Sequence, residues 1–537
     1  MLTWTARRLA AYMTQRLHDT RLILVSNRAP YIHEHPGQPG EPPGRMRRLL
    51  SQVGHLFQRH HTVRWRRPAG GLTAALDPIM QACHGTWVAW GSGNADHETV
   101  DAQDHVQVPP HDPQYTLRRV WLSDTQIEGF YAGFANSTLW PLCHLHLDRT
   151  VYSPAYWRSY QEVNARFGEA VAEECGTGPA LVWFQDYHLA LCPAALRRHR
   201  PDLTLMHFWH IPWPPWDLYR TCPWRRELLE GLLGNDLLGF HLAQHSSNFL
   251  TCAERVLGAD IDEKSGAVRY AGHTTWVRAF PISIDYDWWR ALASARRTAR
   301  RIKHLRTQPA LAHPILGLGV DRLDYTKGIV RRLLAIERFL EHYPAYQGRL
   351  GFVQIAVPSR TEIEAYRLIK QQVETVVDRI NQRFGTATVP VIHYRYEHVE
   401  PAELAAYYRM ADFAMVTSLH DGMNLVAKEF VASQVDRRGV LICSEFAGAA
   451  EALDQALLIN PYDIDSVVET LHRAVEMSPA EKAQRLGRLQ STLAHQNVYR
   501  WLADIFTALD HLPEEPYGST LALMAAPVHP TPALRGA

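Results

Sequence analysis

Asp421 and Glu429 lie in a segment whose residue types could bind a sugar joined to a phosphate group. The apolar run 413–417 predicts a buried strand, an Asp-Gly turn follows it, and a helical pattern continues to residue 430. The free N–H groups and the positive dipole end at a helix start form an anion site, and the two carboxylates could accept sugar hydroxyls. An ordinary strand-to-helix turn with solvated acids explains the segment equally well, so the pattern alone leaves both interpretations open.

Arg322 and Lys327 belong to a second segment that could act on phosphate. Residues 321–328 (DRLDYTKG) follow the apolar run 315–320 and precede a helical pattern. Two fixed cations beside a helix start could stabilise a departing diphosphate. Surface salt bridges are the alternative interpretation, and the position at a strand end favours function.

Polar side chains also follow other predicted strands. Arg28 comes after the run 22–26, Asp186 after 181–184, and His210 after 204–209. A single histidine such as His210 is more often a core or loop residue than a catalytic one. These positions matter together, because ligands of parallel sheets bind at the carboxyl ends of the strands.

Glycines could contact a sugar phosphate through their backbone, and aromatic residues could do so through their rings. A glycine pair lets the backbone approach a ligand closely, although such a pair also occurs in plain turns. Aromatic rings suit stacking on sugars, although most aromatic residues belong to the core. The candidates are Gly70, Gly71, Trp90, Tyr131 and Trp140.

The elements that must position these residues alternate between strands and helices. Strand-like runs recur through the first 281 residues with helical stretches between them, and a second such series begins near residue 284. Alternation of this kind predicts α/β architecture with doubly wound parallel sheets. We expect two Rossmann-like domains, 1–281 and 282–485, with a mobile loop at 33–68, a C-terminal helix at 486–510 and a disordered tail at 511–537.

Composition excludes several classes of protein. The chain has 56 Lys and Arg against 55 Asp and Glu, a net charge of +1, so no overall field recruits nucleic acid or a membrane. Seven dispersed cysteines without a C-x-x-C pair, and a start without a signal-peptide pattern, indicate reduced thiols and a cytoplasmic protein. We expect no metal and no other cofactor, because no zinc spacing, HExxH motif or P-loop occurs.

Several segments in a fixed order give a specific resemblance. Together they resemble the trehalose-6-phosphate synthase family of retaining glycosyltransferases, over roughly residues 20–505. The resemblance implies a GT-B fold, with two Rossmann-like domains facing across a cleft and the C-terminal helix crossing back to the first domain. The matching segments are SNRAP (26–30), AGGL (69–72), GFYAGFANSTLWPLCH (129–144), FQDYHLAL (184–191), HIPWPP (210–215), LLGNDLLGFH (232–241), DRLDYTKG (321–328), VPSRTEIEAY (357–366) and HDGMNLVAKEF (420–430).

The resemblance also implies a reaction. Glucose would pass, with retention, from a nucleotide diphosphate, with UDP-glucose favoured, to glucose 6-phosphate, and the leaving diphosphate would take the acceptor proton. The implied catalytic residues are Arg322, Lys327, His210 and Asp186. The implied donor-binding residues are Gly70, Gly71, Asp421, Gly422, Met423, Asn424, Leu425, Val426 and Glu429. The implied acceptor-binding residues are Arg28, Trp90, Tyr131, Trp140 and Arg360.

Two departures keep alternatives open. His420 stands where some members carry Arg, and residues 33–68 form a longer loop than the shortest members have. The donor base (UDP, ADP or GDP) stays open, as do glycerol 3-phosphate as acceptor and a non-catalytic regulatory role. The resemblance also implies a separate phosphatase, a homo-oligomeric state and a role in trehalose biosynthesis and osmoprotection.

Overall fold

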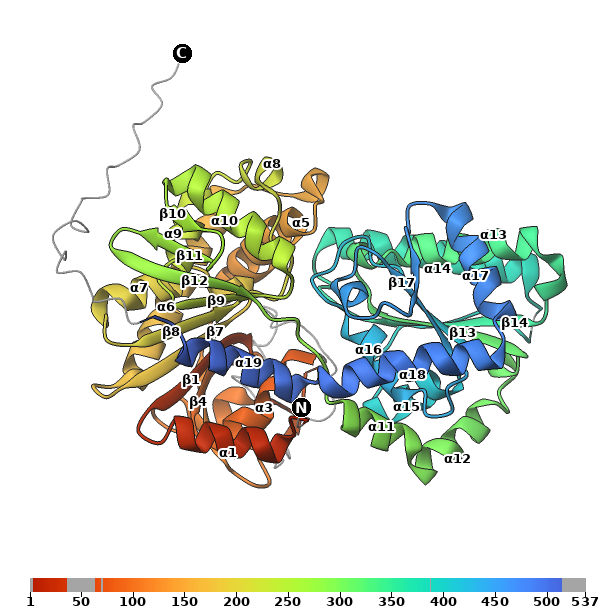
Figure 1. Ribbon diagram of the computed structural model, residues 1–537, viewed down its shortest axis with the longest axis horizontal. Helices are drawn as coiled ribbons and strands as arrows, with labels where there is room; N and C mark the ends of the chain where they lie inside the picture. The colour runs from red at the N-terminus through yellow and green to blue at the C-terminus, as the bar shows by residue number, and fades with distance from the viewer. Residues whose placement is uncertain (1–2, 36–62, 69–70, 387, 514–537) are drawn as a thin grey trace, which may run out of the picture.

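The computed structural model describes residues 3–35, 63–68, 71–386 and 388–513 (Figure 1). The chain forms two lobes, each built around one mainly parallel sheet with helices on both faces. Most of the segment expected to be a mobile loop (36–62) and most of the tail expected to be disordered (514–537) lie outside the described residues. No helix in the described ranges is long and apolar enough to span a bilayer.

The first lobe contains a ten-stranded sheet. Its seven central strands are parallel, and antiparallel strands close both edges. In spatial order the strands are β10 (Asp260–Asp262), β11 (Ala267–Tyr270), β12 (His273–Ala279), β9 (Leu237–Phe240), β8 (Thr204–Phe208), β7 (Ala180–Gln185), β1 (Arg21–Arg28), β4 (Thr86–Trp90), β6 (Tyr115–Val120) and β5 (His105–Val108).

Alternation along β1 shows why this sheet is covered on both faces. Leu22 and Leu24 join one buried cluster and Ile23 and Val25 join another, because successive side chains of a strand point to opposite faces. The longer helices of this lobe are α1 (Ala6–Arg16), α3 (Gly71–Cys83), α6 (Pro154–Cys175), α7 (Cys192–His199), α9 (Arg225–Leu232) and α10 (Ala243–Leu257). Shorter helices are η1 (Asp96–Glu98), α4 (Asp124–Gln126), the π-helix η2 (Ile127–Leu139), α5 (Trp140–Cys143), η3 (Leu147–Arg149), η4 (Tyr187–Leu189) and α8 (Trp216–Tyr219).

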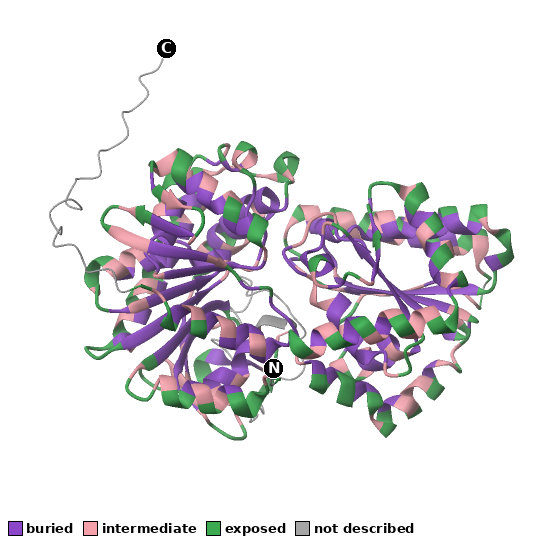
Figure 2. Cartoon of the chain, viewed as in Figure 1, coloured by how far each residue is buried: buried purple, intermediate pink, exposed green. Residues whose placement is uncertain are grey.

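The second lobe has a six-stranded, fully parallel sheet. Its order is β15 (Ile392–Arg395), β14 (Leu350–Val357), β13 (Ile315–Arg322), β16 (Phe413–Val416), β17 (Val440–Ser444) and β18 (Leu457–Ile459). Its longer helices are α11 (Tyr286–Ser294), α12 (Arg296–Leu305), α13 (Ile329–His342), α14 (Glu364–Phe384), α15 (Pro401–Met410), α16 (Leu425–Ser433), α17 (Ile464–Glu476) and α18 (Pro479–His495). The short turns are η5 (Pro309–Leu311), η6 (Tyr325–Lys327), η7 (Pro344–Tyr346) and η8 (Gly448–Glu451). Figure 2 shows the central strands of both sheets as buried interior.

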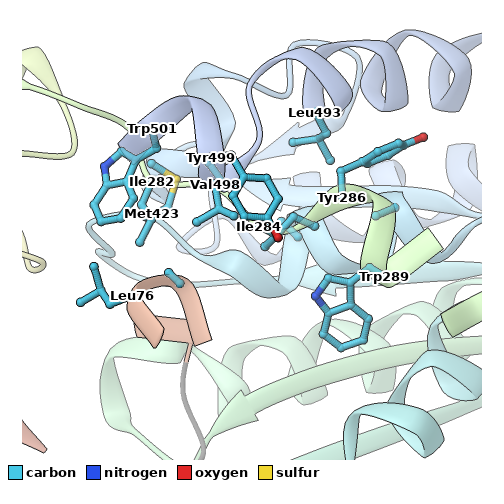
Figure 3. Close-up of a cluster of buried hydrophobic side chains, with 14 of the residues drawn as sticks. Leu76, Ile282, Ile284, Tyr286, Trp289, Met423, Leu493, Val498, Tyr499 and Trp501 are labelled. Carbon is cyan, nitrogen blue, oxygen red and sulfur yellow. The ribbon is translucent and has the colours of Figure 1, made fainter. Parts of the chain in front are cut away.

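The C-terminal part of the described chain returns to the first lobe. The single helix expected over 486–510 is wrong in detail: α18 ends at His495, and α19 (Val498–Asp510) starts after Asn497, whose side chain accepts a hydrogen bond from the Arg500 N–H. Trp501 of α19 donates its indole N–H to the Phe280 carbonyl at 3.1 Å. Figure 3 shows part of a buried cluster to which α3, residues 282–289, the loop before α16, α18 and α19 all contribute. One apolar core therefore joins the two lobes.

The described ends of the segment 33–68 are not irregular. β2 (Ile32–Glu34) and β3 (Arg64–Arg66) pair as an antiparallel two-stranded sheet, with His33 opposite Trp65. The sequence lacked a visible strand period here because each strand has only three residues. The expectation of a loop across the whole of 33–68 is therefore wrong at these ends.

Candidate active site

The strand ends of the two lobes face one another. Gly422, in the second lobe, lies so close to the first that an added Cβ would stand 2.8 Å from the His210 carbonyl oxygen. Arg360 of the second lobe donates from Nη2 to the Tyr187 hydroxyl of the first at 3.1 Å. The segment after β8 therefore meets the Asp-Gly turn, and the segment after β7 meets Arg360, where the two lobes contact one another.

A buried ion pair lies at the centre of the second lobe's contribution. Nζ of Lys327 lies 2.6 Å from Oδ2 of Asp421, and both side chains are about nine-tenths buried. Burial opposes ionisation of this acid, but the Lys327 ammonium holds the pKa of the Asp421 carboxyl well below its usual value. Ser418 and Asn424 donate to the same oxygen at 3.1 and 3.2 Å. The carboxylate is therefore ionised and fixed in position.

The start of α16 forms the rest of this loop. Asn424 adopts a positive φ of 96°, and its side chain caps the helix by accepting the Ala427 N–H at 3.1 Å. The Met423 carbonyl accepts the Ala449 N–H at 2.9 Å. The helix expected after the Asp-Gly turn is confirmed and begins at Leu425, and the positive end of the α16 dipole lies beside Asp421.

Two ionisable residues of α16 lie apart from the ion pair. Oε2 of Glu429 accepts the Tyr408 hydroxyl at 2.8 Å, and burial raises the pKa of Glu429 to about 7. Lys428 is buried, its Nζ donates to the Ile282 carbonyl at 2.7 Å, and burial lowers its pKa to about 7. Glu429 therefore lies on α16, the helix that follows the Asp421 loop, and bonds Tyr408 rather than Asp421 or Lys327.

Arg28 and Tyr131 form a pair in the first lobe. Nη2 of Arg28 donates to the Tyr131 hydroxyl at 3.2 Å. Although burial opposes ionisation, the charges of Arg28 and Arg360 lower the pKa of the Tyr131 hydroxyl to about 8. Tyr131 belongs to the π-helix η2, a rare conformation found mostly at functional sites. The Trp90 ring lies 5.9 Å from the Tyr131 ring, centroid to centroid.

Trp140 receives two guanidinium groups from the other lobe. The guanidinium carbon of Arg360 lies 3.9 Å from its ring centroid and that of Arg322 lies 5.1 Å away. Cation–π attraction of this kind strengthens when the groups are shielded from water. Arg360 also adopts a positive φ of 49° and pairs with Asp324 at 3.1 Å, while its buried Nε has no protein partner.

Asp186 and His210 are neighbours at the ends of β7 and β8. Oδ1 of Asp186 accepts the His210 N–H at 3.2 Å, and Nε2 of His210 lies 2.9 Å from Oε1 of Gln185. Burial raises the pKa of Asp186 to about 6 and pushes the pKa of His210 well below its usual value. His210 is therefore a neutral imidazole, able to bond a hydroxyl without carrying charge.

Some residues of this site were not singled out from the sequence. Asp324, Tyr187 and Tyr366 bond Arg360, although all three lie in segments that were quoted for the resemblance. The Asp-x-Thr spacing at 324–326 is a capping signal that could have identified Asp324. Gly70 lies outside the described residues, and Gly71 is placed only as the first residue of α3. In the described part of the chain, no three His, Cys, Asp or Glu side chains form a group suited to a metal ion.

The chain is similar in sequence to proteins of a known glycosyltransferase family. The sequence profile described as glycosyltransferase family 20 matches residues 47–511. Trehalose-6-phosphate synthase of Mycolicibacterium smegmatis is 41% identical over 456 residues, covering 83% of this chain and 88% of the relative. The protein of the same name from Mycobacterium leprae is 39% identical over 459 residues, covering 84% and 91%.

Solved structures are similar over nearly the whole chain. A UDP-forming α,α-trehalose-phosphate synthase from Burkholderia xenovorans, in complex with glucose-6-phosphate, has a TM-score of 0.78 at 32% identity and covers 91% of this chain and 100% of that one. An E. coli structure bound with UDP-2-fluoro glucose has a TM-score of 0.77 at 29% identity, covering 92% and 100%. These similarities confirm the expected two-domain GT-B fold and an enzyme that transfers sugars: the chain belongs to glycosyltransferase family 20.

Proposed function

We propose that this chain transfers glucose from a nucleoside diphosphate to glucose 6-phosphate with retention, yielding trehalose 6-phosphate. The observation that carries the proposal is the meeting of two differently charged sites at the facing strand ends. One contains Lys327 bound to Asp421 beside the start of α16. The other contains Arg28 with Tyr131. The first suits a diphosphate-linked sugar and the second suits a phosphate monoester.

The donor would bind to the second lobe, which we assign to residues 282–485. Lys327 and Arg322 would face the diphosphate, whose negative charge grows as the glycosidic bond breaks. Asp421 is ionised and fixed by Lys327, Ser418 and Asn424, so it can accept glucose hydroxyls in a set orientation. Glu429 would bond the ribose, and the backbone from Gly422 to Val426 would approach the phosphates.

The acceptor would bind to the first lobe, which we assign to residues 1–281. Arg28 is open to solvent and would bind the phosphate with Tyr131. Arg360 would reach the same phosphate from the second lobe. Trp90 and Trp140 would pack on the sugar ring, and Asp186 would orient a hydroxyl.

The chemical step would use few protein groups. The acceptor hydroxyl attacks the anomeric carbon while the bond from that carbon to the diphosphate breaks, and the proton passes to the leaving diphosphate oxygen on the same face. His210, neutral because it is buried, would bond a donor-sugar hydroxyl. The protein supplies positioning and charge stabilisation.

The surroundings of the reaction follow from the same proposal. Free cysteines, all but Cys83 buried, suit a reducing compartment, so we place the enzyme in the cytoplasm. A separate phosphatase would consume the product. The stretch Asp463–Val467 has the Asp-x-Asp-x-Val spacing of one phosphatase class, but Asp463 caps α17 and Asp465 lies 3.5 Å from Arg338. We also propose a homo-oligomer and a role in osmoprotection.

A donor and acceptor panel tests the function. Wild-type enzyme is incubated with UDP-, ADP- or GDP-glucose and with glucose 6-phosphate or glycerol 3-phosphate, and products are identified by mass. We expect a phosphorylated disaccharide from glucose 6-phosphate, with UDP-glucose as the best donor. Preference for glycerol 3-phosphate would overturn the acceptor assignment, and absence of transfer from every donor would overturn the enzymatic proposal.

A further inference from the structure

One buried carboxylate lies between the two proposed substrate sites. Asp324 follows β13 and is fully buried. Its Oδ1 accepts the backbone N–H and the hydroxyl of Thr326, both at 3.0 Å. Its Oδ2 accepts from Nη1 of Arg360 and from the Tyr366 hydroxyl, both at 3.1 Å. Each oxygen therefore serves a different element.

The Oδ1 side leads to the donor site. By accepting the Thr326 N–H, Asp324 caps the short helix η6, whose last residue is Lys327. The Lys327 carbonyl accepts the Thr417 hydroxyl at 3.1 Å, and its Nζ reaches Asp421 at 2.6 Å. The position of the Lys327 ammonium thus depends on the turn that Asp324 closes.

The Oδ2 side leads to the acceptor site. Arg360, held by Asp324, reaches across to the Tyr187 hydroxyl and lies over the Trp140 ring of the first lobe. Its positive φ is a conformation that costs energy in a non-glycine residue and persists only where surrounding contacts hold it. Asp324 and Tyr366 supply such contacts.

Asp324 is suited to hold both sides at once because it is charged. Burial opposes its ionisation, yet Arg360, Arg322 and Lys327 together lower the pKa of its carboxyl. An ionised carboxylate accepts hydrogen bonds through both oxygens. An asparagine in its place has one acceptor oxygen and one NH2 group, so it can accept the hydrogen bonds from Thr326 or those from Arg360 and Tyr366, but not both sets.

We propose that Asp324 is a positioning residue that couples acceptor binding to donor binding. Resting on the proposed function, the inference is that a nucleoside diphosphate at Lys327 steadies η6 and, through Asp324, the Arg360 guanidinium that receives the acceptor phosphate. The coupling is reciprocal, as any equilibrium linkage between two sites must be.

Calorimetry measures this coupling as a ratio. The Kd of glucose 6-phosphate is determined for the whole enzyme without and with saturating UDP, and the first value is divided by the second. We expect a ratio of about 5 or more for the wild type, in the usual range for coupled sites, and a ratio near 1 for Asp324→Asn. If Asp324 had a purely structural role, its substitution would weaken glucose 6-phosphate binding equally with and without UDP, and the ratio would not change.

Asp321→Asn is the matched control. Asp321 is also buried, lies on β13, and pairs with Arg332 of α13 at 2.6 Å. We expect this variant to lose stability but to keep the wild-type ratio. Equal loss of the ratio in Asp321→Asn and Asp324→Asn would overturn the proposal.

Tyr366→Phe tests the same link with a smaller change. It removes one hydrogen bond to Oδ2 and keeps the ring, so the ratio should lie between the wild-type value and the value near 1 expected for Asp324→Asn. Provided that the wild-type enzyme forms trehalose 6-phosphate, two results would contradict the proposed coupling. One is a wild-type ratio of 1, and the other is an unchanged ratio in folded Asp324→Asn or Tyr366→Phe. Failure of the function itself is distinguished by the absence of trehalose 6-phosphate from the wild-type reaction.

Discussion

Replacing Lys327 by alanine should remove most of the turnover of the folded enzyme. The Lys327 ammonium is about nine-tenths buried and lies 2.6 Å from Asp421. A preorganised group that stabilises charge developing in the transition state contributes about 2.7–4 kcal/mol, so turnover should fall about 10²- to 10³-fold. The variant also leaves the buried Asp421 carboxylate without its cation, which should cost about 3–5 kcal/mol of unfolding free energy.

Lys370→Ala is the matched control for this change. Lys370 pairs with Glu374 at the same 2.6 Å, but the two side chains are 35% and 38% exposed on α14. An exposed pair contributes about 0–1 kcal/mol, so this variant should keep its stability and its turnover.

The assay measures initial rates of nucleoside diphosphate release at saturating substrates, together with urea unfolding curves that confirm folding. Turnover of folded Lys327→Ala within about threefold of wild type would refute the proposed role, since 2.7 kcal/mol corresponds to about a hundredfold. An equal loss in Lys370→Ala would show that the effect is not specific to the site.

Three further predictions concern binding, lobe contact and pH. Arg28→Ala should raise KM for glucose 6-phosphate about 10- to 100-fold, because a charge-assisted hydrogen bond contributes about 1.5–3 kcal/mol, and should leave KM for the donor nearly unchanged. If only the donor KM rises, Arg28 does not bind the acceptor. Gly422→Ala should lower kcat/KM, because the added Cβ would stand 2.8 Å from the His210 carbonyl oxygen. Gly168→Ala is the control: it has open space around it in α6 and should stabilise the protein by about 0.5–1 kcal/mol. Steady-state kinetics and thermal unfolding measure the two effects, and full activity of Gly422→Ala would contradict the close approach of the lobes. Lys428 has a folded pKa of about 7, below its unfolded value of 10.5, so above pH 7 the unfolded state binds more protons than the folded state. The free energy of unfolding should therefore rise from pH 7 toward pH 10.5. Urea titrations should show that Lys428→Met lacks this rise, and an identical pH slope in the two proteins would contradict the buried, deprotonated Lys428.

The sequence was informative where a local pattern decides the structure. The run Leu22–Val25 is apolar without interruption, as expected for a strand covered on both faces, and β1 is such a strand. Arg28, Asp186 and His210 could be placed at strand ends because each follows a run of this kind. Parallel topology then brings such ends to one edge.

Contacts between distant segments could not be predicted in the same way. Nothing local specifies that Lys327 bonds Asp421, 94 residues away, or that Arg360 bonds Tyr187, 173 residues away. The π-helical turns around Tyr131 were also missed, because the sequence carries no signal that separates them from an α-helix. Glu429 matched a motif, yet its contact with Tyr408 depends on how α15 packs against α16.

The most direct test of retaining transfer to glucose 6-phosphate is the anomeric configuration and linkage of the product. Wild-type enzyme, the best nucleoside diphosphate glucose and glucose 6-phosphate are allowed to react, and the disaccharide phosphate is analysed by proton NMR. The spectrum should show two α-configured anomeric centres joined through one oxygen, which is trehalose 6-phosphate formed with retention. A β-configured donor centre, a linkage to any other hydroxyl, or no disaccharide would contradict it.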